Sequence, residues 1–547
     1  MPQQSLSDFV EALDKAGLLV RIKEEKRVDQ LPIVMDQNPG KAVYVEKVKD
    51  CQFSFLANAY SNMDQFTWAL GCNRSEVGPK MAALARGRVK PEVIGTAPCK
   101  EVIVKGADVD LTILPLFLHH DRDGHGYFQD LEFVSADPDT GVPDWGIYRS
   151  MFRTKNELNV DMTCETHRCR LNTLAWRAKG KDMPVSISIG GPIIDKLASL
   201  TGGAGDPNDW EILGSFYGSP AKMVKSETND LLVPANAEIV LEGRIIGTEG
   251  WIYDEGPYGE ATGMYGGGLK HNCRLVIDCI TYRKGAIYQH ATIGGRDPGR
   301  TDVGIGMVAT PAIVTSGLKA AGIDVLDVRA QGPIGEVAYA RIRPRSGGDA
   351  KQALYVMLTI SGETLPKMAM VFDEDVDIWN DAQVLQAQAF RFSPERDVVI
   401  VKGVPSFAVD PTSGTDEPPY MISKLGMDCT IPQGAGWDRN NFTFTLNVTD
   451  LGEPDPNAKQ MTEDEIAKDM EAFIREKPRA WKEIVKRYLA QPYPLLYRAF
   501  GRLRPRLGRT NDSPWFPYTF SAHDFDAVPE PPPLTNFDPK HMKTLSP

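Results

Sequence analysis

The sequence lacks several features that mark whole classes of protein. No run of about 18 apolar residues occurs in its 547 residues, so we predict no transmembrane helix and no membrane partner. The polar N-terminus, MPQQSLSDFVEALDKAG, has no signal-peptide core, and we expect a cytoplasmic protein. The eight cysteines are scattered without a CxxC pair, which indicates reduced thiols. The net charge of −12 argues against a nucleic-acid partner.

Common nucleotide-binding and hydrolase motifs are missing as well. Gly-rich segments at 202–209, 266–270 and 293–300 could bind phosphate through backbone N–H groups. None ends in the GKS or GKT of a P-loop, and none forms a Rossmann GxGxxG between a strand and a helix. No GxSxG motif occurs, so a triad serine hydrolase is not indicated.

What is present is typical of a globular protein of several domains. The 42% hydrophobic and 24% charged residues are ordinary values. The length predicts two to four domains, at roughly 150 residues each. Ser5 and Asp8 have capping-box spacing and Gly17 is a stop signal, so we predict a first helix over 5–16. Further α/β patterns extend this N-terminal domain to residue 95.

Strand patterns dominate residues 96–309. The runs EVIVKG, EIVLEGRII, RLVIDCITY and AIYQHATIGG are rich in β-branched residues and are separated by Gly, Pro and Asp. Regular intervening helices are missing, which favours a barrel or another antiparallel sheet over a doubly wound parallel sheet.

A linking helix and a second α/β region follow. We predict a helix over 310–322 and a domain over 323–450, with DVLDVRAQ, ALYVMLTI and KMAMVFDEDVDIW as strands. The remaining residues, 451–547, form a C-terminal extension. Its first helix is capped by Thr462 and Glu465, and a second helix is predicted over 481–489.

Two glutamates lie five residues apart in the segment Glu255-Gly256-Pro257-Tyr258-Gly259-Glu260. Pro and Gly exclude a helix interior here and predict a tight turn after the strand. Such a turn can aim both carboxylates at one point, where one would hold a proton near neutral pH because close carboxylates do not readily ionise together. We therefore predict a general acid beside a charged partner. The alternative is a pair of solvated loop glutamates.

Arg149 ends the segment DWGIYR (144–149), which indicates a strand that leaves a turn. Its guanidinium could bind a carboxylate in forked geometry. An arginine between two glutamates would keep one anionic and leave the other able to carry a proton. The alternative is an arginine in a surface salt bridge.

Metal candidates centre on His167, in the segment CETHRC. Cys164, His167 and Cys169 have poor zinc spacing, and no second Cys/His cluster completes four ligands. One histidine joined by carboxylates such as Asp144 and Asp209 would instead suit Mg²⁺ or Mn²⁺.

A second loop, HHDRDGH (119–125), also gathers histidines and aspartates. These residues could line a metal or substrate site. The alternative is a solvated loop, which fits the same composition.

Together these segments resemble the UbiD family of decarboxylases, which use prenylated FMN. The resemblance covers roughly residues 90–435. VPA-AEIVLEG followed by EGPYGE is its most specific part. The segments that carry it are DWGIYR (144–149), THR (166–168), NDLLVPANAEIVLEG (229–243), DEGPYGE (254–260), KMAMVFDEDVDIWND (367–381) and KLGMDCTIP (424–432).

The resemblance implies an α/β (α+β) fold of three domains. These would be an N-terminal α/β domain (1–95), a split β-barrel that binds the flavin (96–309) and a C-terminal α/β oligomerisation domain (323–450). The linker helix (310–322) would join the last two, and the extension (451–547) lies beyond the resemblance.

The resemblance also implies catalytic and metal-binding residues. Glu260 would donate the proton that replaces CO2, while Arg149 and Glu255 would orient and tune it. The family's Asn, His and Glu metal ligands would fall on Asp144, His167 and Asp209. Two of these depart from the family, since Asp144 adds a charge and Asp209 shortens an arm.

Further implied sites surround these residues. The flavin would contact Asp144, Trp145, Gly146, Ile147, Arg149, Thr166, His167, Ala198 and Ser199. Potassium would bind at the backbone of Ala198, Ser199 and Thr201, with Arg391 and Asp428 at further family positions near the metal and cofactor. The substrate pocket would include Thr166, His290 and Ile305, although His290 could equally be a packed strand histidine.

The function that the resemblance implies is a reversible, non-oxidative decarboxylation of an aromatic, heteroaromatic or α,β-unsaturated acid, with release of CO2. Prenylated FMN from a flavin prenyltransferase, Mn²⁺ or Mg²⁺, and K⁺ would be the cofactors, and the enzyme would be a homodimer or homohexamer. One alternative is an aromatic-ring carboxylase within a multi-subunit complex, whose partner the extension could dock. Another is a flavin-binding assembly protein without catalysis, suggested by the departures at Asp144 and Asp209.

Overall fold

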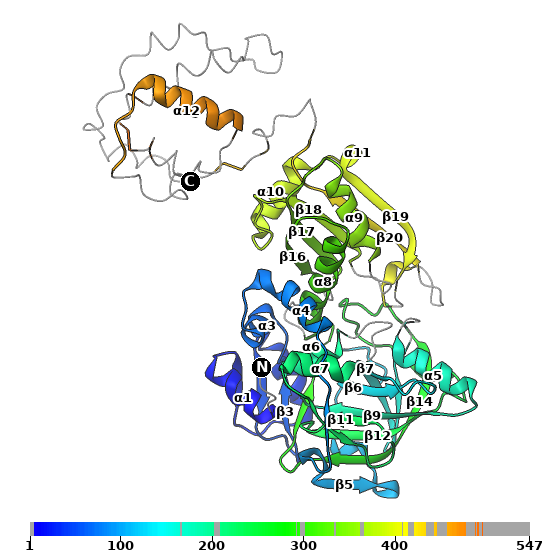
Figure 1. Ribbon diagram of the computed structural model, residues 1–547. Helices are drawn as coiled ribbons and strands as arrows, with labels where there is room; N and C mark the ends of the chain where they lie inside the picture. The colour runs from blue at the N-terminus through cyan, green and yellow to red at the C-terminus, as the bar shows by residue number, and fades with distance from the viewer. Residues whose placement is uncertain are drawn as a thin grey trace. The chain divides into compact units, whose positions relative to one another are not determined.

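The computed structural model divides into two compact units, Met1–Trp437 and Asp438–Pro547. Nearly all named helices and strands lie in the first unit (Figure 1). The residues described are 5–162, 164, 167–201, 208–291, 293–295, 301–332, 335–360, 366–406, 409–413, 421–433, 442, 444–445, 457–476, 487, 490–491 and 495.

The first elements form a small α/β layer. Helix α1 begins after Ser5, whose hydroxyl oxygen accepts the N–H of Asp8, and this confirms the predicted cap. Leu6, Phe9 and Leu13 lie on its buried face. The elements are α1 (Leu6–Lys15), β1 (Leu19–Ile22), α2 (Leu31–Asp36), β2 (Ala42–Val45), β3 (Ser54–Ala57), α3 (Met63–Leu70) and α4 (Val77–Arg86).

A closed barrel of six strands forms the centre of the first unit, as the strand patterns predicted. Its order is β12-β9-β6-β7-β8-β14, and pairing of β12 with β14 closes it; every neighbouring pair is antiparallel. Buried side chains such as Phe133, Ile187 and Leu275 fill the core. The barrel strands are β6 (Tyr127–Ala136), β7 (Pro143–Thr154), β8 (Glu157–Val160), β9 (Met183–Ile189), β12 (Ile239–Ile245) and β14 (Lys270–Tyr282).

Shorter strands and helices flank this barrel. Strands β5 (Val102–Lys105) and β13 (Tyr253–Glu255) pair with opposite ends of β14. Strand β15 (Ile287–His290) pairs with β3 and is the last strand of the N-terminal sheet β1-β2-β3-β15. The segment AIYQHATIGG, which was predicted as part of the barrel, therefore belongs to this other sheet. The remaining elements are β4 (Glu92–Ile94), β10 (Lys222–Lys225) and β11 (Leu232–Pro234), with helices α5 (Arg168–Ala178), α6 (Ile193–Ser199) and α7 (Asp209–Tyr217).

The linking helix starts earlier than predicted. Helix α8 (Thr301–Ala320) contains Pro311 in its interior, so the predicted start at 310 is wrong. Proline is most common in the first turn of a helix, but Pro311 stands in the interior of this one. A Cβ added to Gly78 of α4 would lie 3.2 Å from the Pro311 carbonyl oxygen, so the two helices approach closely at this point.

The C-terminal sheet has the order β16-β17-β18-β20-β19. The predicted strand ALYVMLTI (353–360) is wrong, because it lies mostly in helix α9, which packs on this sheet (Figure 1). Ala353, Leu354, Met357 and Leu358 are buried at helical spacing. The elements are β16 (Val325–Gln331), β17 (Val337–Ile342), α9 (Asp349–Thr359), β18 (Met368–Asp373), α10 (Asp381–Arg391), α11 (Pro394–Asp397), β19 (Val398–Pro405) and β20 (Met421–Asp428).

The second unit contains helix α12 (Glu463–Glu476). Thr462 and Glu465 cap it reciprocally through side chain and backbone, which confirms the predicted capping box. Of the predicted helix over 481–489, only Arg487 lies within the described residues. Across the described part of the chain, no helix is both long and apolar enough to cross a bilayer.

Candidate active site

The predicted turn places both glutamates beside one arginine. Arg149 belongs to β7, Glu255 ends β13, and Glu260 follows in the turn after it. Gly256 begins this turn with a φ of 100°, a conformation that side chains with a Cβ rarely adopt. A Cβ there would also lie 2.4 Å from the Gly268 carbonyl oxygen, so the turn requires glycine at this position.

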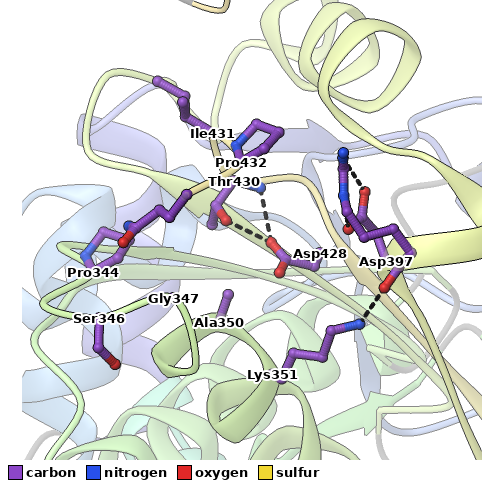
Figure 2. Close-up of a pocket in the computed structure, with 12 residues that line it drawn as sticks. Pro344, Ser346, Gly347, Ala350, Lys351, Asp397, Asp428, Thr430, Ile431 and Pro432 are labelled. Atoms are coloured by element: carbon purple, nitrogen blue, oxygen red, sulfur yellow. Dashed lines mark hydrogen bonds and ion pairs between the residues drawn. The ribbon is translucent and has the colours of Figure 1, made fainter. Parts of the chain in front are cut away.

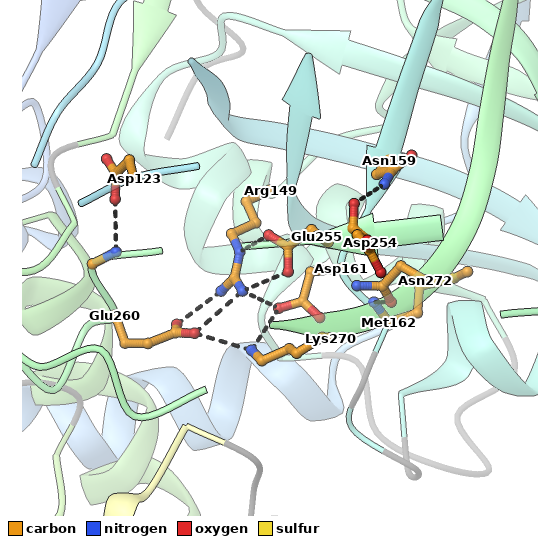
Figure 3. Close-up of polar contacts among 11 residues, drawn as sticks. Asp123, Arg149, Asn159, Asp161, Met162, Asp254, Glu255, Glu260, Lys270 and Asn272 are labelled. Atoms are coloured by element: carbon orange, nitrogen blue, oxygen red, sulfur yellow. Dashed lines mark hydrogen bonds and ion pairs between the residues drawn. The ribbon is translucent and has the colours of Figure 1, made fainter. Parts of the chain in front are cut away.

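Arg149 bridges the two carboxylates (Figure 3). Its Nε lies 3.1 Å from Glu255 Oε1, and its Nη1 lies 2.8 Å from Glu260 Oε2. The guanidinium also stacks 4.1 Å from the centre of the buried Tyr258 ring. The structure therefore brings together Arg149, Glu255 and Glu260, and neither the solvated-loop nor the surface-arginine alternative describes them.

Two further charged residues complete this network, and the sequence reasoning missed both. Asp161 Oδ2 lies 2.8 Å from Arg149 Nη2, and Lys270 Nζ lies 3.0 Å from Glu260 Oε1. All five side chains are at most 13% exposed. With every group ionised, two positive and three negative charges leave a net charge of −1. One proton taken up by a carboxylate would neutralise the network, so the site is chemically suited to hold and release one proton.

The cations of the network remain charged. Burial alone would lower the pKa of Arg149, but the charges of Asp161, Glu255 and Glu260 outweigh burial and hold this pKa well above its ordinary value. The pKa of Lys270 is likewise raised, because Asp161 and Glu260 outweigh the effect of burial. The proton exchanged by this site therefore belongs to a carboxyl group.

The loop HHDRDGH docks on the turn that carries Glu260. Asp123 Oδ1 accepts the Gly259 N–H at 2.8 Å (Figure 3), and the Gly124 N–H donates to the Pro257 carbonyl at 2.8 Å. A Cβ on Gly124 would lie 2.2 Å from the Gly256 carbonyl oxygen, so the two segments are in close contact. This loop is therefore a support for the turn.

The predicted metal ligands lie near one cation. Arg168 Nε is 3.7 Å from Asp144 Oδ1, and Arg168 Nη1 is 3.9 Å from Asp209 Oδ1. His167 stands at the N-cap position of α5, and its ring packs edge-on against that of Tyr148, with ring centres 5.4 Å apart. Burial raises the pKa of Asp144 to about 6 despite the opposing charge of Arg168.

The chemistry of this donor set suits a hard divalent ion, because it combines two carboxylates with one imidazole. Within the described ranges, however, no three His, Cys, Asp or Glu side chains are already assembled at metal-binding distances. Asp209 Oδ2 instead accepts the N–H of Trp145 at 2.7 Å and ties α7 to β7. Arg168 supplies one cation beside both carboxylates.

The other predicted cofactor residues are distributed around this cluster. Trp145, Gly146 and Ile147 follow Asp144 along β7, and the rings of Trp145 and Trp210 lie 5.1 Å apart. Ala198 and Ser199 end α6, where the Ala198 carbonyl accepts both the N–H and the hydroxyl of Thr201. Potassium binding at these carbonyls stays a prediction.

The predicted pocket residues are only partly described. Thr166 lies outside the described residues, and for Ile305 only the backbone, in α8, is described. His290 is buried in β15, with its ring 4.7 Å from that of Phe117 and 6.0 Å from that of His119. Burial, and then His119, lower the pKa of His290 well below its ordinary value, so this imidazole is neutral.

Arg391 and Asp428 lie in the C-terminal part of the first unit. Arg391 forms a forked pair with Asp375, and Asp428 accepts the N–H and the hydroxyl of Thr430. Asp428 lines a small cavity of about 120 Å³, shown with Lys351 and Asp397 in Figure 2. A role for Arg391 and Asp428 near the cofactor stays a prediction.

Comparison with family models gives matches along most of the chain. The N-terminal domain model of the 3-octaprenyl-4-hydroxybenzoate carboxy-lyase family UbiD matches residues 10–85. The model of the Rift-related domain matches residues 92–297, and that of the C-terminal domain matches residues 307–429.

Individual relatives agree with these matches. The phenolic acid decarboxylase of Sedimentibacter hydroxybenzoicus is 30% identical over 454 residues, 78% of this chain and 92% of the relative. The UbiD-class enzyme HmfF from Pelotomaculum thermopropionicum, solved in complex with FMN, is 26% identical with a TM-score of 0.73, and the match covers 81% of this chain and 97% of HmfF. The open form of vanillic acid decarboxylase from Sedimentibacter hydroxybenzoicus is 26% identical with a TM-score of 0.69, covering 89% and 99%. This chain therefore belongs to the UbiD family and is a carboxy-lyase of that family.

Proposed function

We propose that the enzyme is a prenylated-FMN-dependent, reversible and non-oxidative decarboxylase of an aromatic, heteroaromatic or α,β-unsaturated carboxylic acid. The observation that carries this proposal is the bridge from Arg149 to both Glu255 and Glu260. Decarboxylation converts R–COO⁻ and H⁺ into R–H and CO2, so it requires one proton at the reacting carbon. A buried network with one excess negative charge fits this requirement, and the phenolic acid decarboxylases among the relatives favour aromatic acids.

The chain's own residues handle the proton. Arg149 holds Glu255 and Glu260 in fixed positions, and Lys270 adds a second cation next to Glu260. Glu260 gives its proton to the substrate carbon as CO2 leaves. In the opposite direction the Glu260 carboxylate takes a proton from the ring while CO2 adds to the carbon.

The cofactor supplies what these side chains lack. When bound, prenylated FMN provides an electron sink for the pair of electrons that CO2 leaves behind. Asp144, His167 and Asp209 would hold Mn²⁺ or Mg²⁺, and Arg168 would lie beside the flavin phosphate. The carbonyls of Ala198, Ser199 and Thr201 would hold K⁺.

The assembly of the enzyme is also part of this proposal. We expect a cytoplasmic homodimer or homohexamer that receives its flavin from a prenyltransferase. The mass and absorbance of the cofactor released from protein produced with a flavin prenyltransferase would test this directly. Folded protein that carries no flavin would contradict the proposal.

The substitution Glu260→Gln tests the role of the acid. The amide keeps the shape of the side chain but cannot donate a proton, so turnover should fall by about 100-fold or more while flavin content is unchanged. Glu249→Gln, which alters an exposed glutamate paired with Arg274, is the matched control and should keep full activity. CO2 release from a panel of aromatic acids that begins with vanillic acid is the measurement. Full activity of Glu260→Gln would exclude Glu260 as the proton donor.

A further inference from the structure

The segment 261–269 connects the proposed proton donor Glu260 to Lys270, and both of these residues belong to the charged network (Figure 3). Gly267 lies directly against them, because a Cβ added to it would lie 2.8 Å from Glu260 Oε1 and 2.5 Å from Lys270 Nζ. The Glu260 N–H also donates to the Met264 carbonyl at 3.0 Å. A shift of this segment would therefore displace the Glu260 carboxyl group as well.

The neighbouring Gly266 contacts a part of the first unit that is distant in the sequence. A Cβ added to it would lie 2.3 Å from the Val409 carbonyl oxygen and 3.2 Å from Pro411 Cδ. The φ of Gly266 lies outside the left-handed region, so this contact, and not the backbone conformation, requires glycine here. The segment therefore contacts the network through Gly267 and residues 409–411 through Gly266.

An ion pair anchors residues 409–411 to the C-terminal sheet. Lys367 Nζ lies 2.8 Å from Asp410 Oδ2, and the Asp410 side chain is only 7% exposed. The backbone of Lys367 is bonded to the strands on either side, since its N–H donates to the Glu336 carbonyl at 2.7 Å and its carbonyl accepts the Leu425 N–H at 3.0 Å. The sheet thereby fixes the position of residues 409–411.

We propose that Lys367 and Asp410 are positioning residues for the proton donor. Their ion pair holds residues 409–411 against the segment 261–269, and this segment in turn holds Glu260 in place. A catalytic group that is displaced by about 1 Å can lose ~10²-fold in rate, so this support is important for turnover. The inference rests on the proposed function, because it takes Glu260 as the acid.

Two single substitutions disturb this support from opposite sides. Gly266→Ala places a methyl group against the Val409 carbonyl, and Asp410→Ala removes the ion pair that anchors this carbonyl. In the holoenzyme each should lower kcat about 100-fold while KM and flavin content stay unchanged, because the acid is displaced and the binding residues are not. The controls are Gly95→Ala, where the added Cβ meets no atom within 4 Å, and Asp324→Ala, which removes an exposed ion pair; both should keep normal kcat.

The double variant separates positioning from general damage to the fold. Once residues 409–411 are released, they no longer press on position 266. The variant Gly266→Ala/Asp410→Ala should therefore keep a kcat within about 3-fold of that of Asp410→Ala, because changes at residues in contact are coupled. Losses that multiply to about 10⁴-fold would show two independent defects and overturn the inference, as would a normal kcat in either single variant.

Urea unfolding provides a second test that needs no turnover. The loss of stability caused by Gly266→Ala should be smaller in the Asp410→Ala background than in the wild type, and equal losses would refute the contact. If Asp410→Ala does not fold, Lys367→Met removes the same ion pair and should give the same results in both tests. A wild-type holoenzyme that releases no CO2 would overturn the proposed function, whereas an active wild type with an equally active Asp410→Ala would overturn only this inference.

Discussion

Replacement of Lys270 by methionine should both destabilise the protein and change the protonation of its acidic network. Methionine keeps most of the side-chain volume but removes the cation that lies 3.0 Å from Glu260 Oε1. The network would change from a net charge of −1 to −2, because Arg149 would face Asp161, Glu255 and Glu260 alone.

The size of the effect follows from burial. Lys270 and Glu260 are 5% and 4% exposed, and breaking a buried pair by removal of one partner costs ~3–5 kcal/mol. We expect about 3 kcal/mol, the low end of that range, since Arg149 remains on Glu260. The control is Lys155→Met, which breaks a pair with Asp110 of the same 3.0 Å length, 74% and 27% exposed. That loss should stay below about 1 kcal/mol.

The pH dependence of stability shows whether the variant takes up a proton on folding. The folded Lys270→Met protein should bind one more proton than the folded wild type, whereas the glutamates of both unfolded chains ionise above about pH 4.3. Its stability should therefore fall as the pH rises, by up to about 1.4 kcal/mol per pH unit relative to wild type. Urea unfolding from pH 5 to 8 measures this slope. Two results would refute the charge count on which the proposed acid depends. One is a loss of stability no larger than that of Lys155→Met, and the other is a stability difference from wild type that does not change with pH.

Two further predictions concern other buried acids. Burial, and then Glu132, raise the pKa of Asp195 from 3.8 to about 8, so the stability of the wild type should fall as the pH rises between these values. The variant Asp195→Asn keeps a partner for the Tyr217 hydroxyl. In urea titrations its stability relative to wild type should increase with pH up to about pH 8 and stay constant above it. Asp123→Ala removes the acceptor of the Gly259 N–H and should lower kcat about 100-fold, since small displacements of a catalytic group cost this much, with flavin content unchanged. Asp121→Ala, in the exposed part of the same loop, should keep normal kcat, and equal kcat in both variants would contradict the support role.

The fold was predictable where the local pattern and the tertiary structure agree. The β-branched residues of EIVLEGRII and RLVIDCITY predict strands, and both segments form barrel strands that pair with each other. The prediction failed for 353–360, where apolar and β-branched residues suggested a strand but the buried positions follow a helical period. A short apolar run does not distinguish these cases, because the choice depends on which surface covers it.

The site was predictable only in part, for a similar reason. Glu255, Glu260 and Arg149 stand in distinctive segments, and the turn between the glutamates is encoded by its own Gly and Pro. Asp161 has no local signal, since only the pairing of β7 and β8 brings it to Arg149. For HHDRDGH the sequence suggested either a metal or substrate site or a solvated loop. Its role as a support was not predictable, because the backbone that it contacts, at Pro257, lies far away in the sequence.

Lys270 shows how a missed residue follows from sheet register. It stands in GGGLKHN, where glycines suggest a loop and a lysine suggests solvent. The antiparallel pairing of β13 with β14 places it opposite Glu255, and the turn then returns Glu260 to the same point. Because one register sets the positions of the first glutamate and the lysine, a shift by one residue would send Lys270 to the other face of the strand. The pairing of these two strands thus places the lysine that adds the second positive charge to the network.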